Sequence, residues 1–410
     1  MLASLQDILD TVKSNTLTYQ QKLMCLGNIA ERLFDPRELL GYTDEEWQFL
    51  QNQMICDLNE GYAIYRPRYI LPDYNVYIKK GCEFLELPPP KDLDEVLDGL
   101  LILYSHVPSI TTFPVYIGRL DMLLDPFITD EKQDYIKIKR FLNHVDKTVP
   151  DSFCHANIGP YDTKAGRLIL KAVIELEAPT PNMTIRYDKS KTSREFAELA
   201  TKACLLVSKP SFANDAYYIS DLGEQYGIAS CYNALPECGG AYTLTRLRLG
   251  TIARACKTVD EMVNELLPRI AKCALSTMDK RHKFVVEESN FFNTSFLEKE
   301  GFIKRTNFTG MFAIVGLADA ANHKAFDTAA PLVYHPKPCS TRAASLYRQP
   351  EKSEYRCFPP QSHSYQEKTA LRGCPTSHWD QFFSAIPHRS TLLRRVATIF
   401  RADVRPLPNV

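Results

Sequence analysis

The sequence predicts a mixed α/β protein with a helix-rich N-terminal portion. Several segments repeat apolar residues with the period of a helix, at least two read as strands, and strands and helices alternate in the middle of the chain. The 410 residues are 45% hydrophobic, which is enough to bury a large core. This length allows two or three domains, and it equally allows a single α/β barrel with insertions.

The predicted helices carry local start signals. Thr43 is followed three residues later by Glu46, and Thr192 by Glu195; each pair matches a capping box. The predicted helices cover 43–61, 92–107, 129–145, 166–178, 192–207 and 259–280, the last around Pro268. These helices dominate the first half of the chain.

The predicted strands lie in the middle of the chain and towards residue 322. Residues 182–188, "NMTIRYD", read as a strand, and 308–322, "FTGMFAIVGLADAAN", begin as a strand and turn helical. The segment 239–253, "GGAYTLTRLRLGTIA", places Gly239 and Gly240 beside a strand-like run. Glycines in this position predict a close approach of another backbone.

The chain changes character near residue 323. Residues 324–410 hold 13 Lys and Arg against 6 Asp and Glu, a net charge of +7, whereas residues 1–323 hold 36 against 43, a net of −7. The same segment has a single glycine, Gly373, where average usage predicts about 6. Periodicity is lost there except at 390–400. We therefore expect an irregular basic tail.

Composition excludes several classes of partner. The whole chain has no net charge, which argues against nucleic acid or an acidic membrane surface as a partner. The longest apolar runs, such as 99–104, are far shorter than the ~18 residues of a transmembrane helix. The first residues lack the basic start of a signal peptide. We expect a cytoplasmic protein whose twelve cysteines are reduced.

Two of these cysteines, Cys231 and Cys238, share the loop 226–240, "YGIASCYNALPECGG", which shows neither helical nor strand periodicity. The simplest interpretation is a pair of structural thiols in a turn. Their C-x6-C spacing differs from that of a zinc site, and no second pair is near in sequence. The segment Cys154-His155 could add ligands only through the tertiary fold. No bound metal is expected.

The order of motifs around this loop resembles the central region of glycyl radical enzymes. In 181–231, "PNMTIRYDKSKTSREFAELATKACLLVSKPSFANDAYYISDLGEQYGIASC", a strand ends in Arg, a helix follows, and a Pro-Ser-Phe-Asn-Asp segment leads to Tyr-Gly and a cysteine. The matching residues are Arg186, Pro210, Ser211, Phe212, Asn214, Asp215, Tyr226, Gly227 and Cys231. Segments 239–253 and 308–322 look like those that follow in anaerobic ribonucleotide reductases. Residues 1–323 resemble the YjjI-like branch most.

This resemblance implies a ten-stranded α/β barrel, which would be incomplete here. Residues 1–180 would form the helix-rich N-terminal part of the barrel domain, and 181–323 the central strands and the cysteine loop. Residues 324–410 would be the irregular basic tail, which an out-of-frame translation after codon 323 would explain.

The resemblance also implies radical chemistry under anaerobic conditions. A radical S-adenosylmethionine activase removes a hydrogen from a glycine, and no cofactor is bound directly. The glycyl radical forms a thiyl radical on the cysteine, for which Cys231 is the first candidate and Cys238 the second. That thiyl radical removes hydrogen from a small polar substrate. Many relatives carry Cys-x-Glu, where this chain has Asn233; Glu237 is then the nearest candidate base.

Three further residues are predicted to bind substrate: Arg186, Asn214 and Asp215. Each has a structural alternative, because an arginine at a strand end can be a buried ion-pair partner and Asn or Asp can cap a helix. The sequence does not decide between substrate binding and these structural roles.

A radical-glycine motif of the type Arg-Val-x-Gly-Tyr is not found in the sequence. Gly373 lacks the following aromatic residue, and Gly250 comes too early. We therefore expect this chain to be inactive or unstable alone. One alternative is a non-catalytic binding protein that uses its helical part and basic tail. Another is a radical enzyme whose glycine loop comes from a separate small protein. The oligomeric state is left open, with a homodimer as one option.

Overall fold

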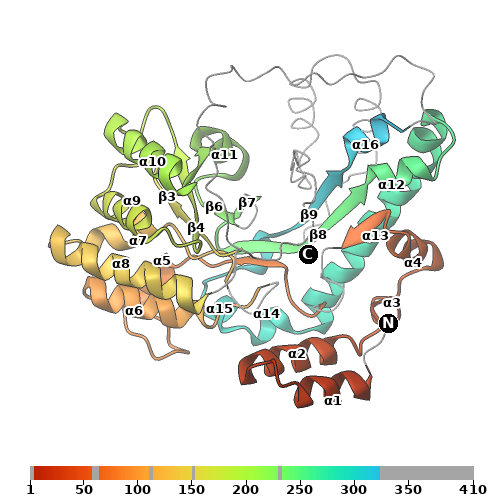
Figure 1. Ribbon diagram of the computed structural model, residues 1–410, viewed down its shortest axis with the longest axis horizontal. Helices are drawn as coiled ribbons and strands as arrows, with labels where there is room; N and C mark the ends of the chain where they lie inside the picture. The colour runs from red at the N-terminus through yellow and green to blue at the C-terminus, as the bar shows by residue number, and fades with distance from the viewer. Residues whose placement is uncertain (1–3, 58–63, 110–113, 150–152, 230–232, 324–410) are drawn as a thin grey trace.

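The computed structural model describes residues 4–57, 64–109, 114–149, 153–229 and 233–323. They form the mixed α/β fold that the sequence predicts, with three small sheets among many helices (Figure 1). The strands are β1 (Ile55–Asp57), β2 (Tyr69–Leu71), β3 (His155–Ile158), β4 (Asn182–Tyr187), β5 (Ser211–Asn214), β6 (Tyr226–Ala229), β7 (Asn233–Pro236), β8 (Gly239–Arg248) and β9 (Phe308–Val315).

The helices are distributed along all of the described residues. They are α1 (Leu5–Lys13), α2 (Tyr19–Glu31), α3 (Pro36–Leu39), α4 (Asp44–Gln51), α5 (Asn75–Lys80), α6 (Leu93–Tyr104), α7 (Leu120–Leu124), α8 (Glu131–Thr148), α9 (Lys164–Leu176), α10 (Arg194–Val207), α11 (Asp215–Leu222), α12 (Leu249–Arg254), α13 (Leu267–Lys283), α14 (Phe291–Thr294), α15 (Phe296–Lys299) and α16 (Leu317–Ala321). Within the described ranges, none of them is long and apolar enough to span a membrane.

The long strand β8 organises one sheet. It pairs in parallel with β9 along one edge and antiparallel with β2 and then β1 along the other. The glycines at its start allow this crowding. A Cβ on Gly240 would lie 1.9 Å from the Tyr69 carbonyl oxygen, and one on Gly239 would lie 2.3 Å from the Asn307 carbonyl oxygen. The close backbone approach predicted for these glycines is confirmed.

A second sheet consists of three parallel strands in the order β3-β4-β5. Helix α9 connects β3 to β4 and α10 connects β4 to β5, and both helices lie beside the strands in Figure 1. Side chains alternate along β4, so that Met183 and Ile185 join the hydrophobic core while Thr184 and Arg186 point to the opposite face. That opposite face carries the polar groups described below.

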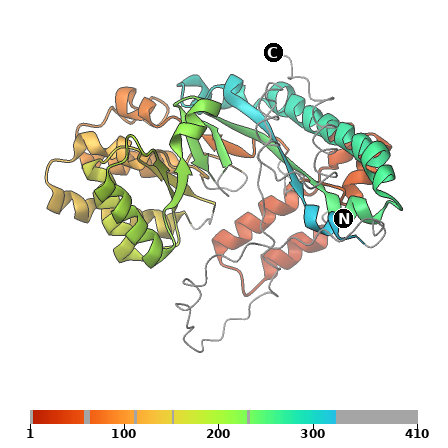
Figure 2. The same cartoon turned by 90° about the horizontal axis from the view of Figure 1, so that it is seen from above.

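A separate hydrophobic cluster lies at the other end of β8. Helix α13 packs there against β8, and α12 packs against α16. Phe49, Ile55, Leu247 and Ile270 are among the buried members of this cluster. Figure 2 shows this group of helices on the opposite side of β8 from the three-stranded sheet, with the α1–α2 pair projecting from the rest.

Some predicted boundaries are wrong. The capping box of Thr43 and Glu46 is present, but the helix ends at Gln51 rather than near residue 61, because Gln53 adopts a positive φ and Ile55 then pairs with Leu247 of β8. This β1 strand is three residues long, too short for a periodic signal.

Other predicted helices also begin elsewhere. The side chain that caps α10 is Ser193, which accepts from the Phe196 amide, and not Thr192. The helix around Pro268 starts as a π-helical turn, Glu261–Leu266, which leads directly into α13, and Pro268 is the second residue of α13.

The sheets of the described residues are small and remain open at their edges. A ten-stranded barrel therefore stays a prediction. The division of the chain at residue 180 is a prediction as well, and the predicted tail, 324–410, lies outside the described residues.

Candidate functional site

The loop with the two cysteines contains a β-hairpin. Strand β6 pairs antiparallel with β7, from Tyr226 opposite Pro236 to Ala229 opposite Asn233. The sequence shows no strand periodicity in this loop, and the expectation that it contains no strand is wrong. Residues 230–232 connect the two strands; they include Cys231, the first candidate for the thiyl radical, and lie outside the described residues. The residues on either side of Cys231 thus belong to one hairpin.

Asn157 fixes the hairpin to the three-stranded parallel sheet. Its side chain donates to the Ile228 carbonyl oxygen at 2.8 Å and accepts from the Ile228 amide at 2.7 Å. Asn157 lies on β3 and is fully buried. A side-chain amide that satisfies both polar groups of one buried residue holds the strand as a further ladder partner would. Strand β6 is therefore held through its backbone, whatever side chain stands at Ile228.

Arg186 and Asp215 form a buried ion pair below the hairpin. Arg186 Nε donates to Asp215 Oδ1 at 2.7 Å, and the two side chains are 2% and 1% exposed. Arg186 also donates to the Tyr226 and Glu224 carbonyl oxygens, both at 3.2 Å. Burial raises the pKa of Asp215, but the hydrogen bond and charge of Arg186 outweigh it and hold this pKa below its ordinary value. The ion-pair interpretation of Arg186 agrees with this geometry.

Tyr226 completes this group. Its hydroxyl donates to Asp215 Oδ1 at 2.8 Å, and the Arg186 guanidinium lies 3.8 Å from the centroid of its ring. Lys191 approaches the other oxygen of Asp215 at 3.4 Å. The charges of Arg186 and Asp215 are thus matched within the protein. Their predicted role in binding substrate stays a prediction.

Glu237 lies at the other end of the hairpin. Tyr116 donates its hydroxyl to Glu237 Oε1 at 2.9 Å, and both side chains are buried. Burial raises the pKa of Glu237 to about 7, because the charged carboxylate loses its hydration. A carboxyl group with this pKa can both accept and release a proton at neutral pH. The role of Glu237 as a base nevertheless stays a prediction.

The ring of Tyr116 also explains Gly227. A Cβ at this position would lie 2.7 Å from the ring of Tyr116. Only glycine lets β6 lie this close to the tyrosine that holds Glu237. Packing against Tyr116 therefore explains why glycine follows Tyr226 in this chain.

Cys238 lies outside the hairpin, between β7 and β8. Its thiol is buried, with Sγ 3.6 Å from the Gly301 carbonyl oxygen, and burial raises its pKa to about 11. Its backbone has a φ of 60°, and its carbonyl oxygen accepts from the backbone amide of Lys304 and from the side-chain Nδ2 of Asn307. Cys238 thus joins the hairpin to the turn before β9. Its role as a second radical candidate stays a prediction.

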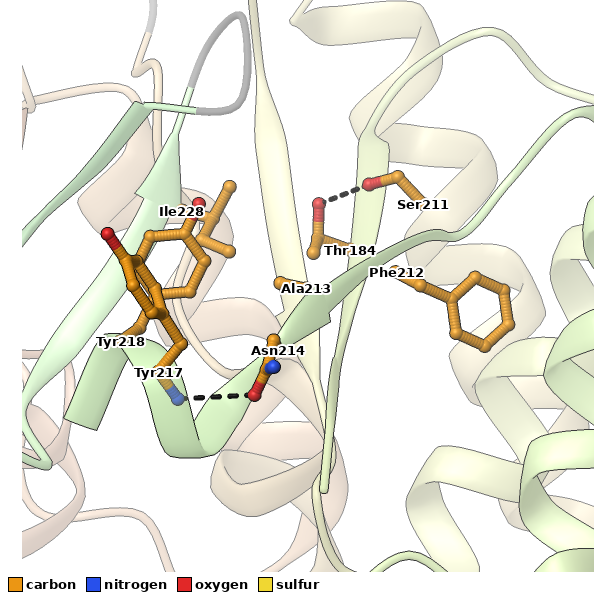
Figure 3. A pocket seen from close by; sticks show the side chains of 8 residues that line it. All are labelled: Thr184, Ser211, Phe212, Ala213, Asn214, Tyr217, Tyr218 and Ile228. Carbon is orange, nitrogen blue, oxygen red and sulfur yellow. Dashed lines mark hydrogen bonds between the residues drawn. The ribbon is translucent and has the colours of Figure 1, made fainter. Parts of the chain in front are cut away.

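Asn214 caps a helix and also lines a cavity, while its role in binding substrate stays a prediction. Its side chain accepts from the Tyr217 amide at 3.1 Å and caps α11, and it also lines a cavity of about 300 Å³ beside Thr184 and Ile228 (Figure 3). Asp215, the next residue, points into the protein and away from this cavity. Of the three residues predicted to bind substrate, Asn214 is the one that lines the cavity.

The sequence reading missed Asn157 and Tyr116. Asn157 lies on β3, at the edge of the three-stranded sheet, and Tyr116 lies just before residues whose backbone bonds to β3. Cys154 directly precedes β3 and His155 is its first residue; His155 Nε2 is hydrogen-bonded to Thr184 Oγ1 at 2.7 Å. Among the described residues, no three His, Cys, Asp or Glu side chains are grouped as metal ligands would be. Asn157 lies in a short buried strand, whose sequence gives little indication of the role of this residue.

The comparison with protein families decides the identity of the chain. The sequence model of the family described as "Glycyl radical enzyme YjjI-like" matches residues 17–331. This chain belongs to the YjjI-like family of glycyl radical enzymes. The resemblance seen in the order of its motifs is confirmed.

Two curated relatives of this YjjI-like chain match it over most of its length. An uncharacterized protein of Haemophilus influenzae is 92% identical over 323 residues, which are 79% of this chain and 63% of the relative. The Escherichia coli protein YjjI, also described as uncharacterized, is 44% identical over 314 residues, which are 76% of this chain and 60% of the relative. The chain thus spans less than two thirds of the length of these relatives.

The fold of the YjjI-like chain is that of anaerobic ribonucleotide reductases. One such structure has a TM-score of 0.60 at 11% identity, with 77% of this chain and 60% of that chain covered. The Thermotoga maritima enzyme with citrate in its active site has a TM-score of 0.59 at 11% identity, with 77% and 69% covered. At this identity the likeness concerns the fold alone.

Proposed function

We propose that the described hairpin belongs to the cysteine half of a radical site, and that Cys231 is the residue that abstracts hydrogen from substrate. Membership of the family supports the glycyl radical chemistry. The observation that carries the residue assignment is the hairpin: Cys231 lies in the three-residue connection between β6 and β7, whose strands are held by Asn157 and by the buried group around Arg186. A strand held this firmly suits a reacting group that must keep its position.

The proposed chemistry is a pair of hydrogen-atom transfers. A glycyl radical takes the hydrogen of the Cys231 thiol, so that the S–H bond breaks and the glycine Cα–H bond forms. The thiyl radical then takes a hydrogen atom from a C–H bond of a small polar substrate and becomes a thiol again. The radical S-adenosylmethionine activase supplies the first radical by removing the glycine hydrogen. Each step transfers one proton and one electron together, so that no charge is left in the site.

Glu237 is proposed as the acid–base group of this site. It lies six residues after Cys231 in the chain, is hydrogen-bonded by Tyr116, and has a pKa of about 7. A substrate radical that bears a hydroxyl group loses that proton more readily than its parent, and a neighbouring carboxylate can accept it.

The complete protein of this kind is proposed to close as a ten-stranded barrel. In this chain β2, β8 and β9 are consecutive in one sheet, β3, β4 and β5 in another, and both β5 and β9 are edge strands within the described residues. Further strands could pair at these edges. We propose that the sequence after residue 323 does not supply them, since a match of 323 residues to a relative at 92% identity agrees with a change of frame near that codon.

The proposal predicts no glycyl radical on this chain alone. The purified chain is incubated without oxygen with a radical S-adenosylmethionine activase, S-adenosylmethionine and a reductant, and electron paramagnetic resonance is recorded. We expect no glycyl doublet, because no glycine of the chain lies in a suitable motif. A doublet from this chain would overturn the claim that it lacks its radical residue. The DNA around codons 320–326 should, in another frame, continue into an Arg-x-x-Gly-Tyr-like motif.

The role of Cys231 is tested in the longer Haemophilus influenzae relative, where no substrate is needed. In D₂O the thiol becomes S–D, and hydrogen transfer between cysteine and glycine then places deuterium on the glycine. The doublet collapses to a singlet because the coupling to the α-hydrogen is lost. Replacing the residue aligned with Cys231 by Ala should preserve the doublet in D₂O, whereas replacing the residue aligned with Cys238 should still allow collapse. The reverse pattern would assign the role to Cys238.

A further inference from the structure

A cavity beside the cysteine hairpin has a lining without charge. Its volume is about 300 Å³, at the small end of the range for ligand sites. It lies between β4 and β5 on one side and α11 with Ile228 of β6 on the other (Figure 3). Ile228 stands three residues before Cys231 in the chain. All eight side chains that line the cavity are neutral at pH 7.

Arg186 and Asp215, which follow cavity-lining residues of β4 and β5 in the chain, are already matched within the protein. Arg186 donates to the Asp215 carboxylate and to two backbone carbonyl oxygens. Asp215 receives hydrogen bonds from Arg186 and Tyr226, and Lys191 approaches its second oxygen. A carboxylate or phosphate in the cavity would therefore lack a cation to replace its hydration.

The polar part of the lining begins with a chain of hydroxyl groups. His155 Nε2 lies 2.7 Å from Thr184 Oγ1, which lies 2.7 Å from Ser211 Oγ. Burial lowers the pKa of His155 to about 3, so the imidazole is neutral. A neutral imidazole and two hydroxyl groups can orient their protons in either direction along the chain. Ser211 Oγ, at the cavity end, also donates to the Met183 carbonyl oxygen at 3.4 Å; it can accept from a ligand, or exchange this long contact for a hydrogen bond to the ligand.

The opposite wall adds an amide and two phenols. Asn214 caps α11 through Oδ1, which leaves the two donors of Nδ2 for a ligand. The rings of Tyr217 and Tyr218 meet edge to face at 5.5 Å, and the Tyr217 side chain is 59% exposed. Aromatic rings beside neutral donors and acceptors suit a molecule with C–H faces and hydroxyl groups.

We propose that this cavity binds an uncharged, polyhydroxylated small molecule. The inference rests on the proposed function in naming that molecule as the substrate class, because the cavity adjoins the strand that leads to Cys231. A hydroxyl group matches Ser211, which can donate or accept, and the amide of Asn214, which donates. The carbon skeleton would pack on Ile228 and the tyrosine rings. The binding step itself requires neither a radical nor an activase.

The test compares two probes of equal size that differ in charge. Xylitol and xylonate have five carbons each, and xylonate replaces one CH₂OH by a carboxylate. Saturation-transfer NMR with the full 410-residue chain in air measures the binding of each. The observed ligand is ¹³C-labelled xylitol, and we expect it to give a saturation-transfer signal. An excess of xylitol at natural abundance should compete for the cavity and reduce this signal. Xylonate should bind at least tenfold more weakly.

Two variants locate the binding without disturbing the fold. Asn214→Asp keeps the side-chain oxygen that caps α11 but removes the Nδ2 donors, and Asp is as good a capping residue as Asn. Tyr217→Phe removes an exposed hydroxyl group. Loss of one hydrogen bond should weaken xylitol binding by about twofold to tenfold in each variant. Tyr161→Phe, which removes another exposed phenol away from the cavity, is the matched control and should leave binding unchanged.

Three outcomes would overturn the inference: no binding of xylitol, equal or tighter binding of xylonate, or xylitol binding that the two cavity variants leave unchanged. Failure of the radical experiments with unaltered xylitol binding would instead count against the proposed function alone. The two failures are therefore distinguishable.

Discussion

Tyr116 and Glu237 lie 121 residues apart in the chain and are joined by a buried hydrogen bond of 2.9 Å. Tyr116 belongs to the segment beside the parallel sheet, and Glu237 follows the cysteine hairpin. This contact brings a carboxyl group with a pKa of about 7 to the base of the hairpin. It thereby makes the stability of the hairpin depend on pH.

The contribution of Glu237 to the stability of the protein should fall as pH rises, and Glu237→Gln should remove this contribution. The pKa of Glu237 is raised from 4.5 to about 7, so the folded state holds a proton that the unfolded chain has lost. This contribution is fully present below pH 4.5 and is lost as pH rises through 7. At pH 8.5 the variant should therefore exceed the wild type by roughly 1–3 kcal/mol in free energy of unfolding.

Urea unfolding at pH 5 and pH 8.5 measures this effect. Asp121, whose pKa burial raises to about 6, and His155, whose pKa burial lowers to about 3, act in opposite directions and should contribute equally to the wild type and to the variant, so the difference between the two proteins reports Glu237. Glu288→Gln, at an exposed position, is the control and should behave as the wild type. An equal change in the free energy of unfolding between the two pH values for the wild type and Glu237→Gln would contradict the prediction.

Arg186→Met should destabilise the protein strongly. The change leaves the Asp215 carboxylate buried without its cation, which typically costs about 3–5 kcal/mol. The double variant with Asp215→Asn should recover part of this loss, because no buried charge then remains. A double-mutant cycle by urea unfolding measures the coupling. Arg194→Met breaks an exposed pair with Glu198 and should leave the stability nearly unchanged. Additive losses at Arg186 and Asp215 would show that the pair is not coupled.

Asn157→Ala should loosen the cysteine hairpin. It removes both hydrogen bonds to the Ile228 backbone and leaves those buried groups unpaired, at about 1–3 kcal/mol each. Amide hydrogen exchange of 226–229 should become faster than in the wild type, while exchange in α13 stays the same. Asn28→Ala, at an exposed helix position, serves as the control. Unchanged exchange in β6 would mean that the β6–β7 pairing alone holds the strand.

Two glycine-to-alanine changes should have opposite effects. A Cβ at Gly240 would meet the Tyr69 carbonyl oxygen at 1.9 Å, so the strands must separate, and we expect a loss of about 1–3 kcal/mol. At Gly27, inside α2, nothing lies within 4 Å, and alanine should stabilise the helix by up to about 1 kcal/mol. Thermal unfolding of both variants checks the pair. Equal effects would show that the crowding around β8 relaxes freely.

Local features could be predicted from the sequence because the interacting groups are close in the chain. The capping box of Thr43 and Glu46 is one example, and the strand and helix of 308–322 are another. The crowding at Gly239 and Gly240 was also predictable, since glycines beside a strand indicate close backbone approach. The family could be inferred because its motifs recur in a characteristic order along the chain.

The site depended on contacts between distant segments. Asn157 meets Ile228 and Tyr116 meets Glu237 only after several strands and helices have packed. The residue pattern of one segment does not indicate which buried polar group of a distant segment its side chains will hydrogen-bond. Strands β3, β5 and β7 were missed for a related reason: each has four residues, too few for a clear period.

The sequence by itself determined the family, the α/β class and the order of the motifs around Cys231, because these depend on residue types and their spacing. Only the tertiary structure decided that the loop is a hairpin, that Arg186 and Asp215 neutralise each other, and that Asn214 faces a cavity without charge. Burial sets the cost of an unpaired charge, and burial is a property of the packed chain.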